Sequence, residues 1–358
     1  MSLRGNDALP PDRQTSPLIV SLLSPGGEYA WDEFVQGCAD ATFFHLSGWK
    51  RVIEEAFGHK TYYLQTQRGG AVTGVLPLTH IKSALFGNSI ISNAFCVYGG
   101  PATNDSESQA ALQREAVTLM ERLGATSLEF RTQKCGLDGW ACKNDLYVTF
   151  RKNLLPNAED NLKAIPRKQR AMVRKGIQQG LRSEVDDGVD RLHRVYSESV
   201  RNLGTPVYPR RYFRLLKETF GNACDILTIV HGHEPVASVL NFYFRDEVMP
   251  YYGGGRAIAR RLAGNDFLYW EVMRRATARG YRVFDFGRSK VATGAYAFKK
   301  NWGFEPTALH YQYKLAPGHK IPEVNPFNPK YRVFIELWKH LPLSVAGIIG
   351  PPIARDLG

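Results

Sequence analysis

The chain has 358 residues, enough for two domains with ordinary hydrophobic cores. Hydrophobic residues make up 44% and charged residues 22%, as in globular proteins. A membrane-spanning helix needs about eighteen consecutive apolar residues, and no run approaches that length. The net charge of +12 indicates an anionic partner, and RNA, an anionic lipid surface and the phosphates of a nucleotide or coenzyme all qualify.

The N-terminal residues 1–17 are polar, contain proline and lack the apolar core of a signal peptide, so we expect a disordered lead-in. The five cysteines are scattered, and the spacing of Cys135 and Cys142 fits no usual zinc pattern. We interpret all five as reduced thiols. These features favour a cytoplasmic protein, with peripheral contact at the inner face of the membrane as an alternative.

Three sequence matches in the same order indicate two copies of one domain. The longest joins EAVTLMERLGATSLEF, Glu115–Phe130, to EVMRRATARGYRVFDF, Glu271–Phe286, without a gap. The repeating unit of roughly 160 residues has the size of a domain, not of a solenoid repeat. The other two matches are WKRVIEEAFG (49–58) with YFRLLKETFG (212–221), and the Tyr-Gly-Gly triplets 98–100 and 252–254.

The first domain is predicted over 18–150. Alternating apolar residues in TYYLQTQ and AVTGVLPLTHI predict a β-hairpin. A helix over Glu115–Leu123 ends at Gly124, and a strand over Ser127–Arg131 follows it.

The second domain is predicted over 151–320 and begins with a basic helix, RKQRAMVRKGIQQG, placed after Pro166. No acidic residue interrupts the basic residues of this helix, among them Arg170 and Arg174, so intrahelical pairing does not explain them. A solvated helix face and an anion-binding surface are both consistent with this pattern. Further helices are predicted over Val189–Arg201, Tyr212–Phe220 and Phe267–Arg279, and short strands between them give an α/β or α+β fold.

The tail, 321–358, contains a helix candidate over Arg332–His340 and the apolar segment LPLSVAGIIGPPI, which three prolines interrupt. We expect it to pack across the two domains. Peripheral membrane contact is the alternative, because basic residues flank the apolar ones.

The segment FDFGRSKVATGAYAFKKNWGFEP carries the most promising chemistry. Gly287 and Gly294 permit a tight loop that a ligand can approach closely. Arg288 and Lys299 can hold phosphate or stabilise an oxyanion, and Tyr296 supplies a wall.

Metal catalysis and several nucleotide-binding classes find little support. His231 and His233 belong to a hairpin turn with no further ligand at a suitable spacing, and no Walker loop or hydrolase elbow occurs. Gly264, before a helix and after Arg260 and Arg261, gives a weak match to a loop that cradles the phosphates of acyl-CoA.

Five motifs resemble those of the FemAB-like transferases, tandem GNAT-fold proteins, and closely those of the branch found with exosortase/PEP-CTERM systems. The motifs are RKQRAMVRKGIQQGL, LGTPVYPRRYF, YYGGG, ARGYRVFDFGRS and TGAYAFKKNWGF. The resemblance covers Leu18 to about Leu315. It implies two tandem GNAT domains, each a mixed sheet flanked by helices. Members of the family attach amino acids from aminoacyl-tRNA to the peptide of a cell-wall precursor.

The resemblance also implies roles for single residues. Lys299 resembles a lysine that supports the aminoacyl-tRNA end and transition-state charge, and Arg201 an arginine that meets the phosphates of a nucleotide-linked acceptor. Tyr208 and Tyr252 resemble acceptor-pocket tyrosines. The chain departs from the family at Ile53, where relatives that use the nucleotide precursor carry a basic residue, and it lacks a long heptad run. These departures argue against a nucleotide-linked muropeptide as acceptor, and the genomic company of the resembled branch implies exopolysaccharide or envelope assembly instead.

The expected reaction is attack of an acceptor amine on an activated acyl carbon. Lys299 and backbone amides would stabilise the oxyanion. Asp285 is the nearest base, although a structural role is equally open because Glu129 occupies the equivalent position. No tightly bound cofactor is expected: aminoacyl-tRNA is the predicted donor substrate, acyl-CoA the alternative, and a non-enzymatic RNA- or membrane-binding module the second alternative. Only the second copy has the glycine- and lysine-rich loop, so the first copy is predicted to form a wall of the acceptor groove.

Overall fold

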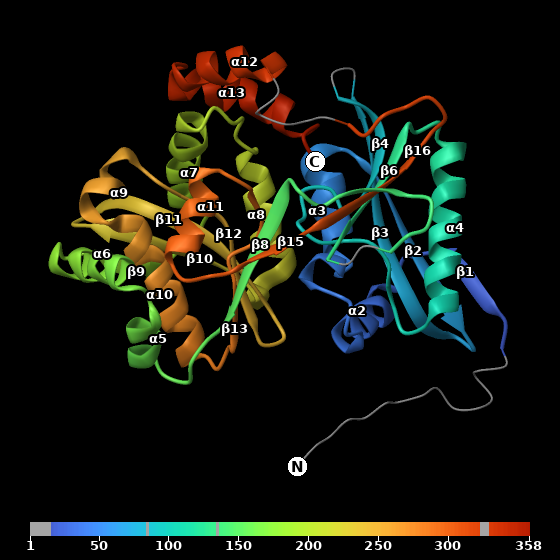
Figure 1. Ribbon diagram of the computed structural model, residues 1–358, viewed down its shortest axis with the longest axis horizontal. Helices are drawn as coiled ribbons and strands as arrows, with labels where there is room; N and C mark the ends of the chain where they lie inside the picture. Colours follow the sequence, from blue (N-terminus) through green and yellow to red (C-terminus); the bar gives the residue numbers. More distant parts are fainter. Residues whose placement is uncertain (1–15, 84–85, 134–135, 323–328) are drawn as a thin grey trace.

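The computed structural model describes residues 16–83, 86–133, 136–322 and 329–358. Two mixed sheets lie side by side, each flanked by helices, as the repeat predicted (Figure 1). Most of the expected lead-in lies outside these ranges. Within them, no helix combines the length and apolar character needed to cross a bilayer.

The first sheet contains the predicted β-hairpin, formed by β2 and β3, and is covered by α4, which is longer than predicted. Asp105 caps that helix by accepting a hydrogen bond from the backbone of Ser108 (2.7 Å). The helices of this half are α2 (Glu28–Gly37), α3 (Gly48–Phe57) and α4 (Ser106–Arg122). In spatial order the strands are β1 (Leu18–Leu22), β2 (Lys60–Arg68), β3 (Ala71–Ser83), β4 (Gly87–Ser92), β6 (Ser127–Thr132), β16 (His310–Leu315) and β7 (Ala141–Lys143), with β5 (Ala102–Thr103) beside β3.

The second sheet repeats this plan, and the predicted helices are present within a few residues of their expected bounds. In spatial order its strands are β14 (Ser289–Lys290), β8 (Tyr147–Asn153), β13 (Val283–Asp285), β12 (Glu247–Gly255), β11 (Glu234–Phe244), β10 (Cys224–His231) and β9 (Arg182–Val185), with β15 (Pro306–Ala308) beside β8. Its helices are α5 (Ala158–Ala164), α6 (Arg167–Gln178), α7 (Asp190–Asn202), α8 (Arg210–Phe220), α9 (Ala257–Leu262), α10 (Gly264–Ala278) and α11 (Gly294–Asn301).

The two halves exchange strands. β8, which precedes the basic helix in the chain, pairs with β13 of the second sheet, so that Arg151 lies opposite Asp285. β16, which follows α11 in the chain, pairs with β6 of the first sheet, so that Tyr313 lies opposite Glu129. Each half therefore needs a strand from the other part of the chain to complete its sheet.

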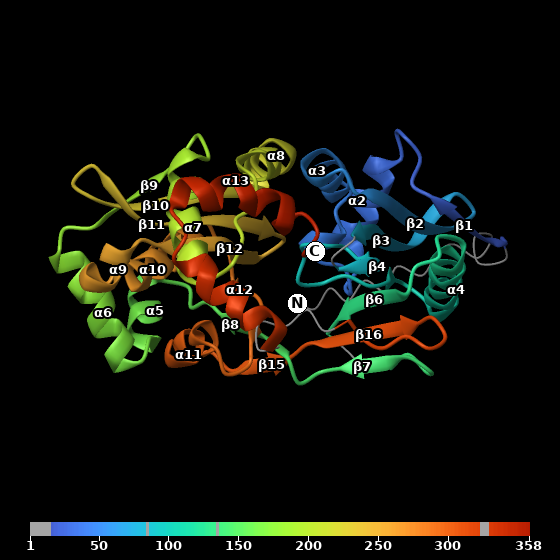
Figure 2. The ribbon, with the colours of Figure 1, turned by 90° about the horizontal axis from the view of Figure 1, so that it is seen from above.

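The upstream repeat helices α3 and α8 contact each other at the junction of the halves (Figure 2). Phe43 stacks on Phe242 with ring centroids 4.4 Å apart, and Trp49 lies 5.3 Å from Phe220. Because these buried rings come from both halves, one hydrophobic core runs across the junction.

The tail forms α12 (Pro329–Lys339) and α13 (Leu343–Ala354), which both contact α7. Pro342 precedes α13, but Pro351 and Pro352 lie inside its last turn and do not interrupt it, contrary to expectation. A proline removes the N–H that donates to the carbonyl four residues earlier, and at the end of a helix little of the helix follows that this loss could disrupt.

The cysteines differ from the sequence interpretation. Cys38, Cys96 and Cys224 are free and buried, whereas Cys142 is disulfide-bonded, so reading all five as reduced thiols was wrong. Cys135 lies outside the described residues.

Candidate active site

The site begins where two strands of the second sheet diverge. β12 and β13 pair in parallel only at Glu247 with Val283 and at Val248 with Phe284. Beyond that point β12 continues to Gly255 with pairing to β11 alone. Within the described residues, the backbone of β12 after Val248 thus has no strand partner on its β13 side, and an extended ligand can pair with such an edge.

The corresponding place in the first half is closed. β4 and β6 pair up to Ile91 and Glu129. The chain after β4 then binds β6: the Arg131 N–H donates to the Ser92 hydroxyl (2.9 Å), and the Gly99 N–H donates to the Arg131 carbonyl (2.8 Å). The two copies therefore differ at the equivalent position, and only the second has a free edge there.

Asp285 lies at the end of β13 and is fully buried. Its carboxylate accepts hydrogen bonds from the Tyr98 hydroxyl (2.8 Å), the Thr149 hydroxyl (3.0 Å) and the Gly287 N–H (2.7 Å). The Arg151 Nε lies 3.6 Å away. Because three donors already hold this carboxylate, its contacts favour a role in positioning the loop over proton abstraction.

Lys299 approaches the same loop from the other side. It lies on α11, and its buried Nζ donates to the carbonyls of Gly287 (2.9 Å) and Arg288 (3.1 Å). Burial lowers its pKa to about 7, although Asp285 acts in the opposite direction. An ammonium has three N–H bonds, and the carbonyls use two, which leaves one for a ligand.

Arg288 and Lys290 add two more cations beside Lys299. The Arg288 guanidinium lies 4.5 Å from the Tyr147 ring centroid and donates to the Tyr311 hydroxyl (2.8 Å). Burial and the neighbouring Arg288 lower the pKa of Lys290 to about 8. Among the described residues, none of these three cations forms an ion pair with a carboxylate, which is typical of an anion-binding site.

The remaining loop residues support this arrangement. The Thr293 hydroxyl caps α11 by accepting from the Tyr296 N–H (3.3 Å) and donates to the Lys290 carbonyl (2.8 Å). Tyr296 packs edge-to-face on Phe150, 5.5 Å away, and is half-buried beside Lys299. The structure thus brings together Asp285, Arg288, Tyr296 and Lys299, as the sequence predicted them to be neighbours.

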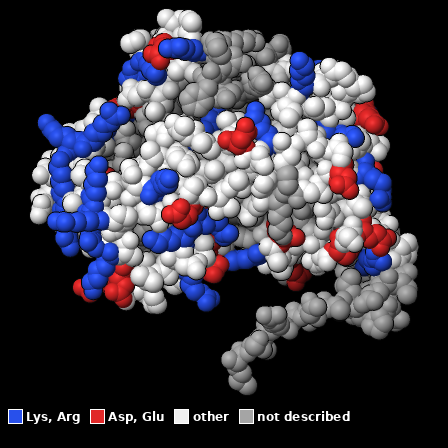
Figure 3. All heavy atoms as spheres, viewed as in Figure 1, with Lys and Arg blue, Asp and Glu red and all other residues white. Residues whose placement is uncertain are grey.

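The residues predicted to bind the donor phosphates lie on helices that surround α10. Gly264 is the first residue of α10, and a Cβ there would lie 2.7 Å from the Val236 side chain. Packing alone therefore accounts for a glycine at this position. Arg170 donates to the Lys163 carbonyl (2.6 Å) and is half-buried. Both α6 and α9 contact α10, and Figure 3 shows basic side chains gathered on their side of the molecule. The exposed cations of α6 and α9 are Arg167, Lys168, Arg174, Lys175, Arg260 and Arg261.

The predicted acceptor residues lie at the junction of the halves, and the tail covers part of them. The rings of Tyr208 and Tyr252 are 5.7 Å apart, and the Tyr252 hydroxyl is 2.8 Å from that of Tyr212. Arg201 donates to the Lys339 carbonyl of α12 (3.0 Å). Its guanidinium is therefore engaged by the tail and not directed at an open groove.

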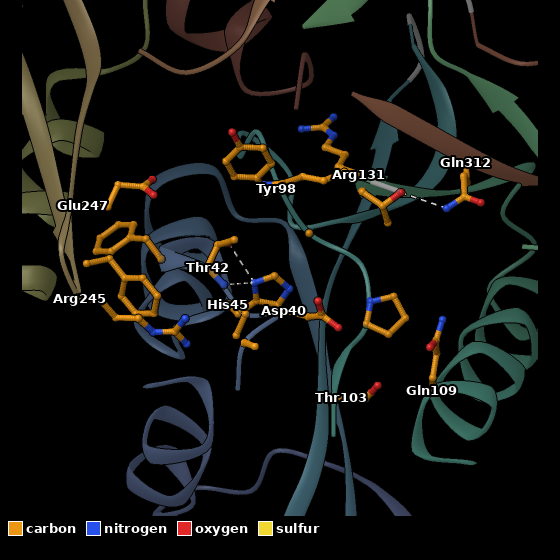
Figure 4. A pocket seen from close by; sticks show the side chains of 18 of the residues that line it. Asp40, Thr42, His45, Tyr98, Thr103, Gln109, Arg131, Arg245, Glu247 and Gln312 are labelled. Carbon is orange, nitrogen blue, oxygen red and sulfur yellow. Dashed lines mark hydrogen bonds between the residues drawn. The ribbon is translucent and has the colours of Figure 1, made fainter. Parts of the chain in front are cut away.

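Sequence reasoning missed a cavity of about 420 Å³ between the halves (Figure 4). Tyr98 and Arg151 line it and also contact Asp285. Glu247 lines it too, and burial together with Asp285 raises the pKa of its carboxyl to about 7. Only the repeated Tyr-Gly-Gly triplet gave a signal for Tyr98. Other polar side chains in the wall are Asp40, Thr42, His45, Thr103, Gln109, Gln113, Arg131, Thr132, Gln133, Arg245, Asp246 and Gln312.

Residues 165–300 match one family model, the acetyltransferase (GNAT) domain. No curated protein matches the chain in sequence. The fold is that of tandem GNAT proteins. Similar solved structures include FemX (TM-score 0.64, 14% identity, 88% of this chain and 100% of that one), the C-terminal domain of a putative lysylphosphatidylglycerol synthetase from Agrobacterium fabrum (0.55, 14%, 80% and 91%), and a tandem GNAT protein from the clavulanic acid biosynthesis pathway (0.51, 12%, 85% and 99%).

These similarities confirm the predicted fold class. The FemX structure agrees with the FemAB-like resemblance at the level of the fold. The association with exosortase/PEP-CTERM systems stays a prediction.

Proposed function

We propose that the protein is an acyltransferase that moves an activated acyl group onto an amine of a cell-envelope or exopolysaccharide precursor. The observation that carries this proposal is the group of three cations, Arg288, Lys290 and Lys299, at the loop that follows β13, the strand that leaves β12 unpaired after Val248. Cations held partly out of water without a carboxylate partner destabilise the fold. Binding of an anionic ligand would account for their presence. An anionic donor and a developing oxyanion are ligands that this arrangement fits.

In the proposed reaction, the acyl carbonyl of the donor lies near the free N–H of Lys299. The acceptor amine attacks the acyl carbon, and the oxyanion of the tetrahedral intermediate accepts a hydrogen bond from the Lys299 ammonium. The new C–N bond forms while the C–O bond of an aminoacyl ester, or the C–S bond of a thioester, breaks. The leaving oxygen or sulfur receives the proton that the amine gives up. With a pKa of about 7, Lys299 can also transfer that proton near neutral pH.

We place the acceptor in the cavity between the halves. Its wall carries the carboxylates of Asp246 and Glu247 beside the guanidinium groups of Arg151 and Arg245, so it offers groups of both charges to an acceptor that carries an amine. The alternative place, beside Arg201 and Tyr208, is occupied by the tail: Arg201 binds the Lys339 carbonyl, and His59 lies 2.6 Å from the Arg355 carbonyl. Together with Ile53 at the position of an expected basic residue, this supports an acceptor other than a nucleotide-linked muropeptide.

Two donors remain candidates. Aminoacyl-tRNA is favoured by the exposed basic residues of α6 and α9, which cover a larger surface than a coenzyme needs. Acyl-CoA is the second candidate, favoured by the N-terminus of α10, where Ala263 has a left-handed backbone (φ +58°) and Arg260 lies one helix turn upstream.

The deciding experiment compares thermal protection by charged tRNA, uncharged tRNA and a series of acyl-CoAs, because a ligand of the folded state raises its stability by mass action. Charged tRNA that protects more than uncharged tRNA supports aminoacyl transfer, and protection by acyl-CoA supports N-acyl transfer. If none of them protects the protein, the proposed transferase activity is wrong.

A further inference from the structure

The tail carries an apolar surface that none of the described residues covers. Val333 and Leu337 of α12 are 67% and 66% exposed, and Ile348 of α13 is 75% exposed. Of the sixteen large hydrophobic side chains exposed among the described residues, seven lie on these two short helices. Single exposed apolar residues are ordinary, but a cluster of them marks an interaction surface. The other four members of this apolar face are Phe334, Leu343, Val345 and Ile349.

The opposite sides of both helices are fixed to the protein. Trp338 and Ala346 are buried, and Gly204, just after α7, lies so close to Ile335 that a Cβ there would be 2.4 Å from the Ile335 side chain. Gly350 lies against the backbone of Val207 in the same way. The helices are therefore docked through one face and present the apolar face outward, above α7 (Figures 1 and 2).

The chemistry of the apolar face fits a lipid bilayer. α13 contains no charged residue from Leu343 to Ala354. Basic Arg332, Lys339 and Arg355 lie toward the ends of the two helices, where Lys339 pairs with Glu336 (2.8 Å) and Arg355 with Asp356 (3.3 Å). This is the pattern of helices that lie in the membrane interface with their apolar side chains among the acyl chains. The net charge of +12 favours an anionic membrane and opposes association with a second copy of the same chain.

We propose that the apolar face of α12 and α13 docks the protein on an anionic bilayer surface. The docked orientation places the loop between α7 and α8, which α12 and α13 contact, next to the lipid headgroups. An acyltransferase held in this way can reach envelope precursors that are attached to lipid. This last consequence rests on the proposed function, whereas docking itself does not.

The test is sedimentation with vesicles of phosphatidylcholine, with and without phosphatidylglycerol. The full-length protein is compared with the triple variant Val333→Asp, Leu337→Asp, Ile348→Asp, which should lose vesicle binding by about ten-fold or more for each side chain. The matched control places the same three charges on exposed apolar residues of the first half, as Ile19→Asp, Leu22→Asp and Tyr29→Asp, and should bind like the parent protein. Circular dichroism verifies that both variants fold.

Docking is overturned if the parent protein does not sediment with phosphatidylglycerol vesicles, or if the control variant loses binding as much as the tail variant. Equal binding to vesicles with and without phosphatidylglycerol overturns the proposal that the bilayer must be anionic. A tail variant that changes only the molecular mass in analytical ultracentrifugation shows an interface between copies instead. None of these measurements requires turnover, so failure of the proposed function leaves them interpretable.

Discussion

The Tyr98 hydroxyl donates a 2.8 Å hydrogen bond to the buried carboxylate of Asp285 and thereby joins the two copies of the repeat. Neither repeat equivalent makes this contact. Tyr252, the counterpart of Tyr98, pairs with the Tyr212 hydroxyl, and Glu129, the counterpart of Asp285, pairs with Arg131 (2.7 Å). One position in the duplicated unit thus holds the loop around Gly287 in the second copy and an internal ion pair in the first.

Tyr98→Phe should lower the free energy of unfolding by about 1–3 kcal/mol, because it removes a hydrogen bond to a buried charge. Tyr252→Phe is the matched control: it removes contacts with neutral groups only, the Tyr212 hydroxyl and the Phe95 carbonyl, and should cost less, about 0.5–1.5 kcal/mol. Urea unfolding of both variants measures the difference. Equal losses would show that the contact with Asp285 contributes no more to the free energy of unfolding than a contact between neutral groups.

Local patterns in the sequence were sufficient for much of the fold. The hairpin of β2 and β3 and the helices α7, α8 and α10 follow from short-range periodicity and end signals. The loop of Arg288 and Lys299 is compact in sequence, so its residues were bound to be neighbours.

Contacts between distant segments had no such signal. β8 and β16 exchange sheets, and nothing in their own residues specifies a partner more than a hundred positions away. For the same reason the sequence did not reveal that Thr149 and Tyr98 hold Asp285, or that Lys339 covers Arg201. Such contacts form only when folding brings distant segments together, so no local sequence pattern marks them.

Lys299→Ala should reduce turnover by about 10²–10³, the usual effect of removing one oxyanion donor. Lys300→Ala is the control, since Lys300 is the next residue of α11 but is exposed. The measurement is kcat with whichever donor protects the protein. An unchanged rate for Lys299→Ala would rule out its assignment as the oxyanion donor.

Lys299→Met should stabilise the protein while it removes activity. The folded-state pKa of about 7 lies below the ordinary value of 10.5, so the unfolded chain binds more protons between these two values. Burial of the charge therefore destabilises the fold fully below about pH 7, and the effect disappears as the pH rises toward the ordinary value. We expect a gain of about 2–5 kcal/mol at about pH 6 that shrinks steadily toward pH 10.

Denaturant unfolding of the parent protein and Lys299→Met at several pH values checks this dependence, with Lys300→Met as the exposed control. A gain that is the same at every pH would mean that Met packs better than Lys and that the charge is not the cause. A loss of stability would mean that the two carbonyl contacts of Lys299 outweigh its desolvation.

The basic residues of α6 and α9 provide the last prediction. If they bind the tRNA backbone, the double variant Arg174→Ala, Lys175→Ala should bind charged tRNA more weakly. The slope of log affinity against log salt concentration should become shallower by about 1–2. The double variant Arg260→Ala, Arg261→Ala should lose more affinity for acyl-CoA than for tRNA if the N-terminus of α10 holds a coenzyme phosphate. Lys314→Ala, on β16 of the first sheet, removes a cation outside both helices and should change neither affinity. Filter binding over a range of salt separates these outcomes, and equal losses for both pairs with both donors would show that the surface attracts anions without forming a donor site.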